Sequence, residues 1–470
     1  MPHCNILVVS DLHFGEELLP GATSERRHAV ELGARAFREF LRYHEVRRLD
    51  GRPWRLVIAG DLFDFMSVML PGTREKPART ADERHFGLAR GTRTAIPRLQ
   101  MICENHRALL ADLVSFATAG HEIDIIVGNH DIELLEPEVV AELHRQLAAP
   151  ADVVARIRVV PWFVYEPGVA WIEHGHIYDE GCSFEYNQAP WIPKDGRLLF
   201  NADYAATRYL AMTRPEIDPH GIEEWSFAGY LHYGWNIGLR SVWEMMTAYA
   251  RFGASLMRVR RMHRSVKIRE QRRRVHRDRL RNIASETGVS VDALSAIDRL
   301  ARAPVTISLR RLARVIMLDR FVTLGGLAVA LLAMLVLLPL IWTLVGSLAI
   351  VGGVVGIQAW LGKHMVTSQL PMRAVPNRLR KLVDAPVVVF GHTHDPRWQP
   401  LRSGGLYVNC GTWLPATRPG LRRSFTHVLI QPRPDEPLVQ LRQWRDGVPQ
   451  PFDAGADLGA GVTAPGIEAA

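Results

Sequence analysis

The segment NILVVSDLH, residues 5–13, joins a short apolar run to an abrupt polar ending. Ile6, Val8 and Val9 are β-branched, which is typical of a buried β-strand. Asp11 and His13 follow where that strand must end. The predicted strand therefore brings a carboxylate and an imidazole, groups that bind metals or transfer protons, to its carboxyl end.

The same pattern recurs four times along the chain. The segments are RLVIAGDLFD at 55–64, IDIIVGNHD at 123–131, VAWIEHGH at 169–176 and PVVVFGHTH at 386–394. Between the first two strands, residues 28–46 have helical spacing, so strand and helix alternate as in an α/β fold. Strand ends of an α/β sheet face one crevice, and we expect the polar clusters to meet there.

These polar clusters carry carboxylate, amide and imidazole groups. One such cluster alone is weak evidence, because Asp and His often end strands by bonding to the backbone. Five clusters, each after an apolar strand, are hard to explain in that way. A mixture of Asp, Asn and His suits divalent ions such as Mn²⁺, Fe²⁺, Co²⁺ or Zn²⁺ better than Ca²⁺. There are more potential ligands than one ion needs.

In their order, the five blocks resemble the calcineurin-like metallophosphoesterase family, whose pattern is D-x-H, G-D-x-x-D, G-N-H-D/E, H-G-x and G-H-x-H. The resemblance covers residues 5–180 and 386–415. It implies an α/β sandwich of two β-sheets flanked by helices. It also implies hydrolysis of a phosphate ester or pyrophosphate bond by a hydroxide held between two metal ions, with Mn²⁺ as the favoured metal.

The resemblance also assigns the metal ligands residue by residue. One ion would be bound by Asp11, His13 and His394, the other by Asn129, His174 and His392, and Asp61 would bridge the two. His176 is an alternative to His174, because either imidazole of the H-G-H block could face the site. Asn409 and Gly411, in YVNCGTW, match a turn that follows the last block and is expected to be structural.

Three further residues are candidates for catalysis. His130 follows the ligand Asn129 and is expected to remain unligated, placed to protonate the leaving oxygen. Asp64 or Asp131 would hold its other ring nitrogen and fix the tautomer. The chain has no Gly-x-Ser-x-Gly motif and no P-loop, which argues against covalent acyl transfer and P-loop nucleotide hydrolysis.

Residues 321–362 contain no charged residue, and Pro339 lies near the middle of the run. The run is about twice the 20 residues that cross a bilayer core of about 30 Å, which predicts a transmembrane hairpin of two helices. His174 and His392 flank the run and should reach the same ion, so a single crossing is excluded. Basic residues at both ends predict a catalytic domain on the cytoplasmic side of the membrane. A hairpin buried against protein is the alternative.

A basic tract, RVRRMHRSVKIREQRRRVHRDRLR, occupies residues 258–281. Either it is the solvated face of a long helix, or it binds anionic lipid headgroups. Nucleic acid is the disfavoured partner, because no second helix pattern supports a DNA-binding motif. The net charge of +8 agrees with acidic partners in general, and the four cysteines have no spacing typical of a zinc module or a disulfide scaffold.

The predicted organisation is therefore a metallophosphoesterase domain split by an insertion. The expected units are 1–190 and 363–450 for the two parts of that domain, 191–320 for a helical basic insertion, 321–362 for the hairpin, and 451–470 for a disordered tail. The predicted function is a metal-dependent phosphohydrolase at a membrane. Its substrate could be lipid-linked, as in the UDP-diacylglucosamine pyrophosphatases that VVSDLHFG and GDLFD resemble, or a nucleotide or phosphoprotein. A non-catalytic scaffold of the same fold is the alternative, although no ligand is missing.

Overall fold

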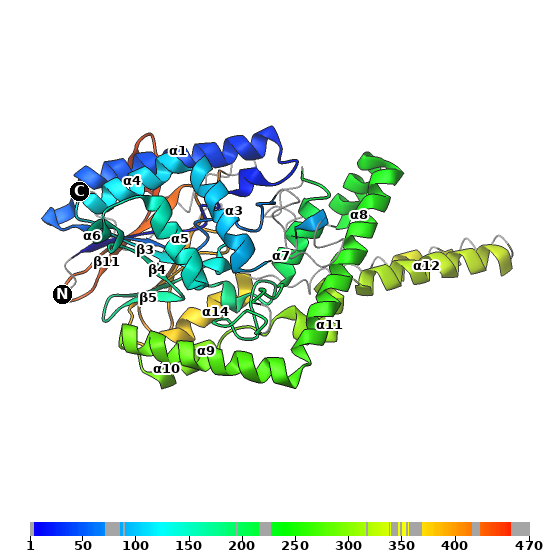
Figure 1. The fold of residues 1–470 in the computed structure, drawn as a ribbon. Coiled ribbons are helices and arrows are strands. Elements are labelled where there is room, and N and C mark those ends of the chain that lie inside the picture. The colour runs from blue at the N-terminus through cyan, green and yellow to red at the C-terminus, as the bar shows by residue number, and fades with distance from the viewer. Residues whose placement is uncertain are drawn as a thin grey trace.

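The computed structural model describes residues 4–70, 85–87, 90–193, 196–215, 227–315, 318–337, 339, 346–347, 350–353, 356, 369–415 and 424–452. They form an α/β structure with two mixed β-sheets (Figure 1). The strands are β1 Asn5–Val9, β2 Trp54–Ile58, β3 Glu122–Ile126, β4 Ile157–Val160, β5 Phe163–Glu166, β6 Ala170–Glu173, β7 Val387–Phe390, β8 Arg397–Pro400, β9 Leu406–Asn409, β10 Thr426–Gln431, β11 Leu438–Arg445 and β12 Val448–Pro451.

Helices fall into two sets. Those before β6 are α1 Ser24–Val46, α3 Thr92–Asn105, α4 Arg107–Thr118, α5 Pro137–Leu147 and α6 Ala151–Val154, with short turns η1 Glu16–Leu18, η2 Leu49–Gly51 and η3 Ile132–Leu135. Those between β6 and β7 are η4 His176–Tyr178, α7 Ala202–Ala206, η5 Thr207–Ala211, α8 Phe227–His263, α9 Val266–Thr287, α10 Val291–Asp298, η7 Val305–Ile307, α11 Leu309–Val315, α12 Leu318–Leu337 and α14 Gln369–Leu379. The second set is thus one long insertion between two strands.

The first sheet has seven strands in the order β12-β11-β10-β1-β2-β3-β4. Strands β1 to β4 are parallel, and β10 joins β1 in antiparallel orientation. Because parallel strands end at the same edge, the residues after β1, β2 and β3 lie together. Asp11, Asp61 and Asn129 occupy that edge.

The second sheet has five strands in the order β5-β6-β7-β9-β8, and β6, β7 and β9 are parallel. His174 follows β6 and His392 follows β7. These two strands are hydrogen-bonded neighbours although the whole insertion separates them in sequence. The insertion is therefore a crossover connection that returns the chain to the strand beside the one it left.

The two sheets pack face to face, with helices on both outer faces. Alternate residues of β1 show this: Ile6 and Val8 belong to the core between the sheets, together with Ile172 and Val389 of the second sheet. Leu7 points the other way, into a core shared with α1, α3, α4 and α5. The outer face of the second sheet is covered by α9, α10 and α14. The period of two along the strands thus produces four layers.

The predicted transmembrane hairpin at 321–362 is wrong. Within the described residues, no helix is long and apolar enough to cross a membrane. Helix α12 has 20 residues, but its first turn includes Asp319 and Arg320, so its uncharged part is shorter than the roughly 20 residues that a bilayer core requires. Beyond residue 337, most of the predicted hairpin lies outside the described residues, as does the predicted tail from residue 453 onward.

Helix α8 is buried at some of its apolar residues and exposed at others. Phe252, Leu256 and Val259 are buried, in contact with segments that include α7 and η7. Trp243 and Met246, nearer the middle of the helix, are 72% and 39% exposed. The described part of the molecule therefore buries Phe252, Leu256 and Val259 and leaves Trp243 in contact with solvent.

Candidate metal centre

Five of the predicted ligands sit in an unusual backbone conformation. The non-glycine residues with positive φ include Asp11, His13, Asp61, His392 and His394, with φ between 51° and 68°. Bulky side chains rarely adopt this left-handed region, and such residues cluster at functional sites. The strand ends therefore bend sharply, and these bends turn the side chains toward a common point.

The first group of possible ligands consists of Asp11, His13 and His394. The Nε2 atoms of His13 and His394 lie 3.2 Å apart, and His394 Nε2 lies 3.1 Å from Asp11 Oδ1. Asp11 and His13 are completely buried. Their ligand atoms all lie within 4.8 Å of one another, which allows them to hold one metal ion.

The second group lies around Asp61 and His174. His174 Nε2 is 3.2 Å from Asp61 Oδ2 and 2.9 Å from Asn129 Oδ1. Its other nitrogen, Nδ1, lies 2.9 Å from the Ala59 carbonyl oxygen, to which it can only donate. Nε2 therefore faces two oxygens, a contact that either a proton on this nitrogen or a metal ion bound between these atoms can satisfy.

The pKa values of His174 and Asp11 reflect the pairing of imidazole and carboxylate groups in the centre. Burial lowers the pKa of His174, but the Asp61 carboxylate and further bonds outweigh burial and raise it to about 9. Burial raises the pKa of Asp11, but the nearby His394 and His13 outweigh it and hold the pKa well below its usual range. A bound divalent cation would supply the charge that protonated histidine supplies in its absence.

His392 differs from the prediction in its partner. Its Nε2 lies 3.2 Å from Asp179 Oδ2, and its backbone N–H donates to Asp11 Oδ2 over 3.0 Å. Its ring lies 5.2 Å from that of His174, between centroids. Asp179, Cys182 and His392 form a separate group whose ligand atoms lie within 4.8 Å of one another. His392 thus stands at the rim of the centre, held by a carboxylate that was not predicted.

His176, the alternative to His174, is also buried but is placed differently. Its ring centroid is 5.4 Å from that of His174. None of the described groups of possible ligands includes it. Burial and the neighbouring His174 and His392 lower its pKa well below the usual value, so it stays neutral. The geometry therefore directs His174, rather than His176, toward Asp61 and Asn129.

His130 lies between two carboxylates. Its Nδ1 is 3.1 Å from Asp64 Oδ1, and its Nε2 is 3.7 Å from Asp203 Oδ2. Burial lowers the pKa of His130, but Asp64, Asp61 and Asp203 outweigh it and raise the pKa well above the usual value. His130 is therefore an imidazolium with a proton to give, although its ring also lies within one group of possible ligands, together with His13 and Asp61.

Of the two predicted partners of His130, Asp64 fills the role and Asp131 does not. Asp131 instead accepts backbone N–H groups from Gly128, over 2.6 Å, and from Leu62, over 2.9 Å. It thereby ties the turn after β3 to the turn after β2. Burial and the nearby Asp61 raise its pKa to about 7. In this structure Asp131 joins the two loops that carry Asp61 and Asn129.

Asp203 is a site residue that the sequence did not reveal. It lies on α7, inside the insertion, and accepts the Asn129 amide over 2.9 Å. The next residue, Tyr204, is buried with the Arg90 guanidinium over its ring at 4.3 Å, which fixes α7 against the main body. No motif surrounds Asp203, so nothing in the sequence pointed to it. Asp179 had a weak signal, because it follows the H-G-H block by three residues.

Two glycines in the polar clusters are required because the side chain of a possible metal ligand lies against the backbone at each position. A side chain at Gly60, whose φ is +92°, would collide with the His174 ring. A side chain at Gly128 would collide with the Asp61 carboxylate. Each glycine precedes a ligand and allows a ligand from a neighbouring strand to lie against the backbone. Asn409 and Gly411 behave as expected of a turn, since the Gly411 N–H donates to Asn409 Oδ1 over 3.0 Å.

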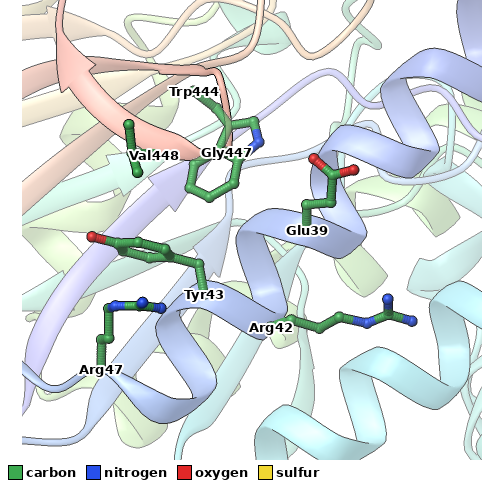
Figure 2. Close-up of a pocket in the computed structure, with 7 residues that line it drawn as sticks. All are labelled: Glu39, Arg42, Tyr43, Arg47, Trp444, Gly447 and Val448. Atoms are coloured by element: carbon green, nitrogen blue, oxygen red, sulfur yellow. The ribbon is translucent and has the colours of Figure 1, made fainter.

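A surface pocket lies elsewhere, between α1 and the turn that joins β11 to β12 (Figure 2). It is lined by Glu39, Arg42, Tyr43, Arg47, Trp444, Gly447 and Val448. The Arg47 guanidinium lies over the Tyr43 ring at 4.2 Å, and the Tyr43 and Trp444 rings are 5.4 Å apart. None of the possible metal ligands lines this pocket, so it is separate from the candidate centre.

No protein-family model and no curated protein matches this chain. Its chemistry is therefore inferred from the site. The described residues include groups of histidine, aspartate and cysteine side chains that could hold a metal ion, and they lie at the carboxyl ends of strands from both sheets.

Proposed function

We propose that this protein is a metal-dependent phosphohydrolase of the calcineurin-like metallophosphoesterase type, which cleaves a phosphate ester or a pyrophosphate bond. The convergence of Asp11, Asp61 and His174 carries the proposal. These residues follow three different strands, β1, β2 and β6, and their ligand atoms lie within 4.8 Å of one another. Buried carboxylates and imidazoles gathered in this way are costly to fold unless they bind a cation.

The residues fit two divalent ions. Asp11, His13 and His394 would hold one, His174 and Asn129 the other with His392 close by, and Asp61 lies between the two sets. When bound, two such ions polarise a phosphoryl group, lower the pKa of water and neutralise the charge that develops on the phosphoryl oxygens. Mn²⁺ is our first choice, and Fe²⁺, Co²⁺ or Zn²⁺ suit the same donors.

His130 has the role of general acid in this proposal. Its Nδ1 is oriented by Asp64, over 3.1 Å, and its Nε2–H would protonate the leaving oxygen. The pKa of His130 is raised well above its usual value, chiefly by Asp64 against the effect of burial, so the proton is present at neutral pH. In this proposal His130 supplies the proton for the leaving oxygen, and the other residues of the centre hold the metal ions.

The test is hydrolysis of a chromogenic phosphodiester and a chromogenic monoester by the full chain with Mn²⁺. Asp61→Asn and Asn129→Ala should each lower kcat at least a hundredfold. Asp112→Asn is the matched control, since Asp112 pairs with Arg38 and Arg42 on the helical face of the molecule. Activity that survives in both site variants would refute the assigned site.

Metal content separates the enzyme from a scaffold of the same fold. The proposal expects two equivalents of transition metal per chain, measured by mass spectrometry of the purified protein, and fewer in Asp61→Asn. A chain that binds no transition metal and hydrolyses neither substrate would instead act as a scaffold.

A further inference from the structure

Positive charge is concentrated in one part of the insertion. Residues 258–281 contain twelve Lys and Arg residues and two Asp and Glu residues, a net charge of +10. The whole chain carries +8, so all remaining residues together are slightly acidic. The basic character of the protein is therefore a local property of the end of α8 and of α9, rather than a property of its whole surface.

Several of these basic residues are exposed and unneutralised. Arg261, Arg264, Lys267 and Arg277 are exposed and form no ion pair with any described residue. Others in the tract serve the fold: Arg272 is buried and donates to the Ala189 carbonyl over 2.9 Å. The exposed set continues from the last turns of α8 into the first three turns of α9. Ion pairs with described carboxylates also involve Arg269, Arg272, Arg273, Arg274, Arg279 and Arg281. The unneutralised charge of the tract is therefore that of the four exposed residues named first.

An exposed aromatic residue lies on the same face of α8 as Arg261. Trp243 is 72% exposed, and it precedes Arg261 by 18 residues, which is five full turns of an α-helix. The kink of α8, at Gly238, lies before this stretch and does not disturb the alignment. One side of α8 thus presents a large apolar side chain near the middle of the helix and an exposed cation near its carboxyl end.

Helix α12 adds an apolar element next to this basic end of α8. Arg260 donates to the backbone carbonyls of Thr306 and Ile307, which directly precede α11, and α11 leads into α12. Figure 1 shows α12 projecting from the body beyond α8. Its exposed apolar residues are Val322, Val329, Leu332, Leu335, Val336 and Leu337, between 63% and 76% exposed. Exposed apolar side chains gathered in one projecting helix mark an interaction site.

We propose that these parts form one surface that binds the face of an anionic lipid membrane. We name it the lipid-facing surface and define it as the exposed residues of α8 from Trp243 onward, the exposed basic residues of α9, and α12. Basic side chains would contact anionic headgroups, while Trp243 and α12 would enter the headgroup region from one side without crossing the bilayer. The proposal does not depend on the proposed hydrolysis.

The combination of charges with exposed apolar residues favours lipid over nucleic acid. Nucleic acid would use the basic residues, and a single exposed Trp could stack on a base, but a helix with exposed Val and Leu offers no such contact. An anionic membrane uses both parts of the surface. Interfacial helices with Lys and Arg on one side and Trp and Leu on the other have this composition.

The experiment is sedimentation of the full chain with vesicles of phosphatidylcholine, with and without phosphatidylglycerol. We expect binding only when phosphatidylglycerol is present, with at least a tenfold loss between low and high salt. Arg261→Glu with Arg264→Glu should weaken apparent affinity at least tenfold. Leu332→Asp with Leu335→Asp should weaken it several-fold, since both side chains are more than 60% exposed and their replacement leaves the core intact.

One double variant and one single variant serve as controls. Arg402→Glu with Arg433→Glu reverses the same charge at exposed positions outside the surface and should leave binding unchanged. Val46→Asp changes an exposed apolar residue of α1, 74% exposed, and should also leave it unchanged. Circular dichroism checks that each variant is folded.

Three results would overturn the proposal. The first is equal binding to vesicles with and without phosphatidylglycerol. The second is binding that Arg261→Glu with Arg264→Glu leaves intact. The third is displacement of the vesicles by duplex DNA or by RNA at lower concentration, which would assign the surface to nucleic acid.

Discussion

Asp179 illustrates how a single residue supports the candidate centre without being one of its predicted ligands. Its carboxylate lies 3.2 Å from His392 Nε2, and it also accepts the Gly181 N–H over 2.7 Å, so its position is fixed. A carboxylate behind an imidazole sets the ring orientation and raises its basicity. This arrangement leaves His392 Nδ1 as the nitrogen for a metal ion.

We therefore predict that Asp179→Asn lowers Mn²⁺ affinity by about 10- to 100-fold, because the imidazole loses the charge that orients it. Isothermal titration calorimetry of the metal-free chain with Mn²⁺ measures this directly. Asp384→Asn is the control, since that carboxylate is 75% exposed and pairs only weakly with Arg380 over 3.7 Å. Equal affinities in the two variants would contradict the role of Asp179.

A prediction for His130 depends on the leaving group. His130→Ala should lower kcat by about 10²- to 10⁴-fold for an alkyl phosphate, whose alkoxide must be protonated to leave. For p-nitrophenyl phosphate the loss should be below about tenfold, because nitrophenolate leaves without a proton. Steady-state rates on the two substrates check the prediction. The same loss on both would mean that His130 positions the substrate and does not donate the proton.

The sequence indicated the residues at the strand ends but not those supplied by the insertion. Asp11, Asp61 and His174 each end an apolar run, so a period-two pattern followed by a polar residue was sufficient to find them. Asp203 comes from α7, and its approach to Asn129 depends on how the insertion folds back over the site. The local sequence pattern around Asp203 contains no information on such a long-range contact.

At the scale of elements, α8 shows where a periodic pattern is reliable. The apolar residues from Trp243 to Val259 are spaced by three or four positions, yet Phe252, Leu256 and Val259 are buried and Trp243 is exposed. Periodicity shows which residues share a face of a helix, but it cannot show how far the neighbouring elements extend along that face. The same limit applies to α12, whose apolar composition was interpreted as part of a membrane-spanning hairpin.

Leu256 tests the packing of α8. It is completely buried against a cluster that includes Tyr209, Val305 and Leu312, so Leu256→Ala should lower the free energy of unfolding by about 2–5 kcal/mol. Met246→Ala, on the exposed half of the same helix, should cost less than about 0.5 kcal/mol. Urea denaturation followed by circular dichroism compares the two. A smaller effect at Leu256 than at Met246 would show that α8 does not pack as described.

For the whole molecule, the insertion returns to the strand beside the one it left. β6 and β7 pair in parallel, so a long, largely helical segment can be accommodated without disturbing either sheet. The repeated strand-end clusters implied this, because His174 and His392 had to meet. The arrangement of the insertion around the site could not be predicted, since its helices are held by individual contacts such as Arg272 to the Ala189 carbonyl.

Two buried histidines, one on α1 and one on β10, lie close to each other. His44 of α1 lies near His427 of β10, with ring centroids 6.3 Å apart, and its Nδ1–H donates to the Phe40 carbonyl over 3.0 Å. Burial lowers the pKa of His44 from 6.5 to about 4 and that of His427 well below its usual value. Both rings are therefore neutral in the folded state at neutral pH.

These shifts predict how stability depends on pH. Between pH 6.5 and 4 the unfolded state binds a proton at His44 that the folded state does not, so stability is fully present above pH 6.5 and falls as the pH drops. The pKa difference corresponds to a loss of about 3 kcal/mol from His44 alone. Urea denaturation at pH 7 and pH 4.5 should show a smaller difference in His44→Phe than in the wild type. His28→Phe, which removes an exposed histidine of the same helix, should retain the wild-type difference, and a His44→Phe variant equally sensitive to acid would assign the loss to other groups.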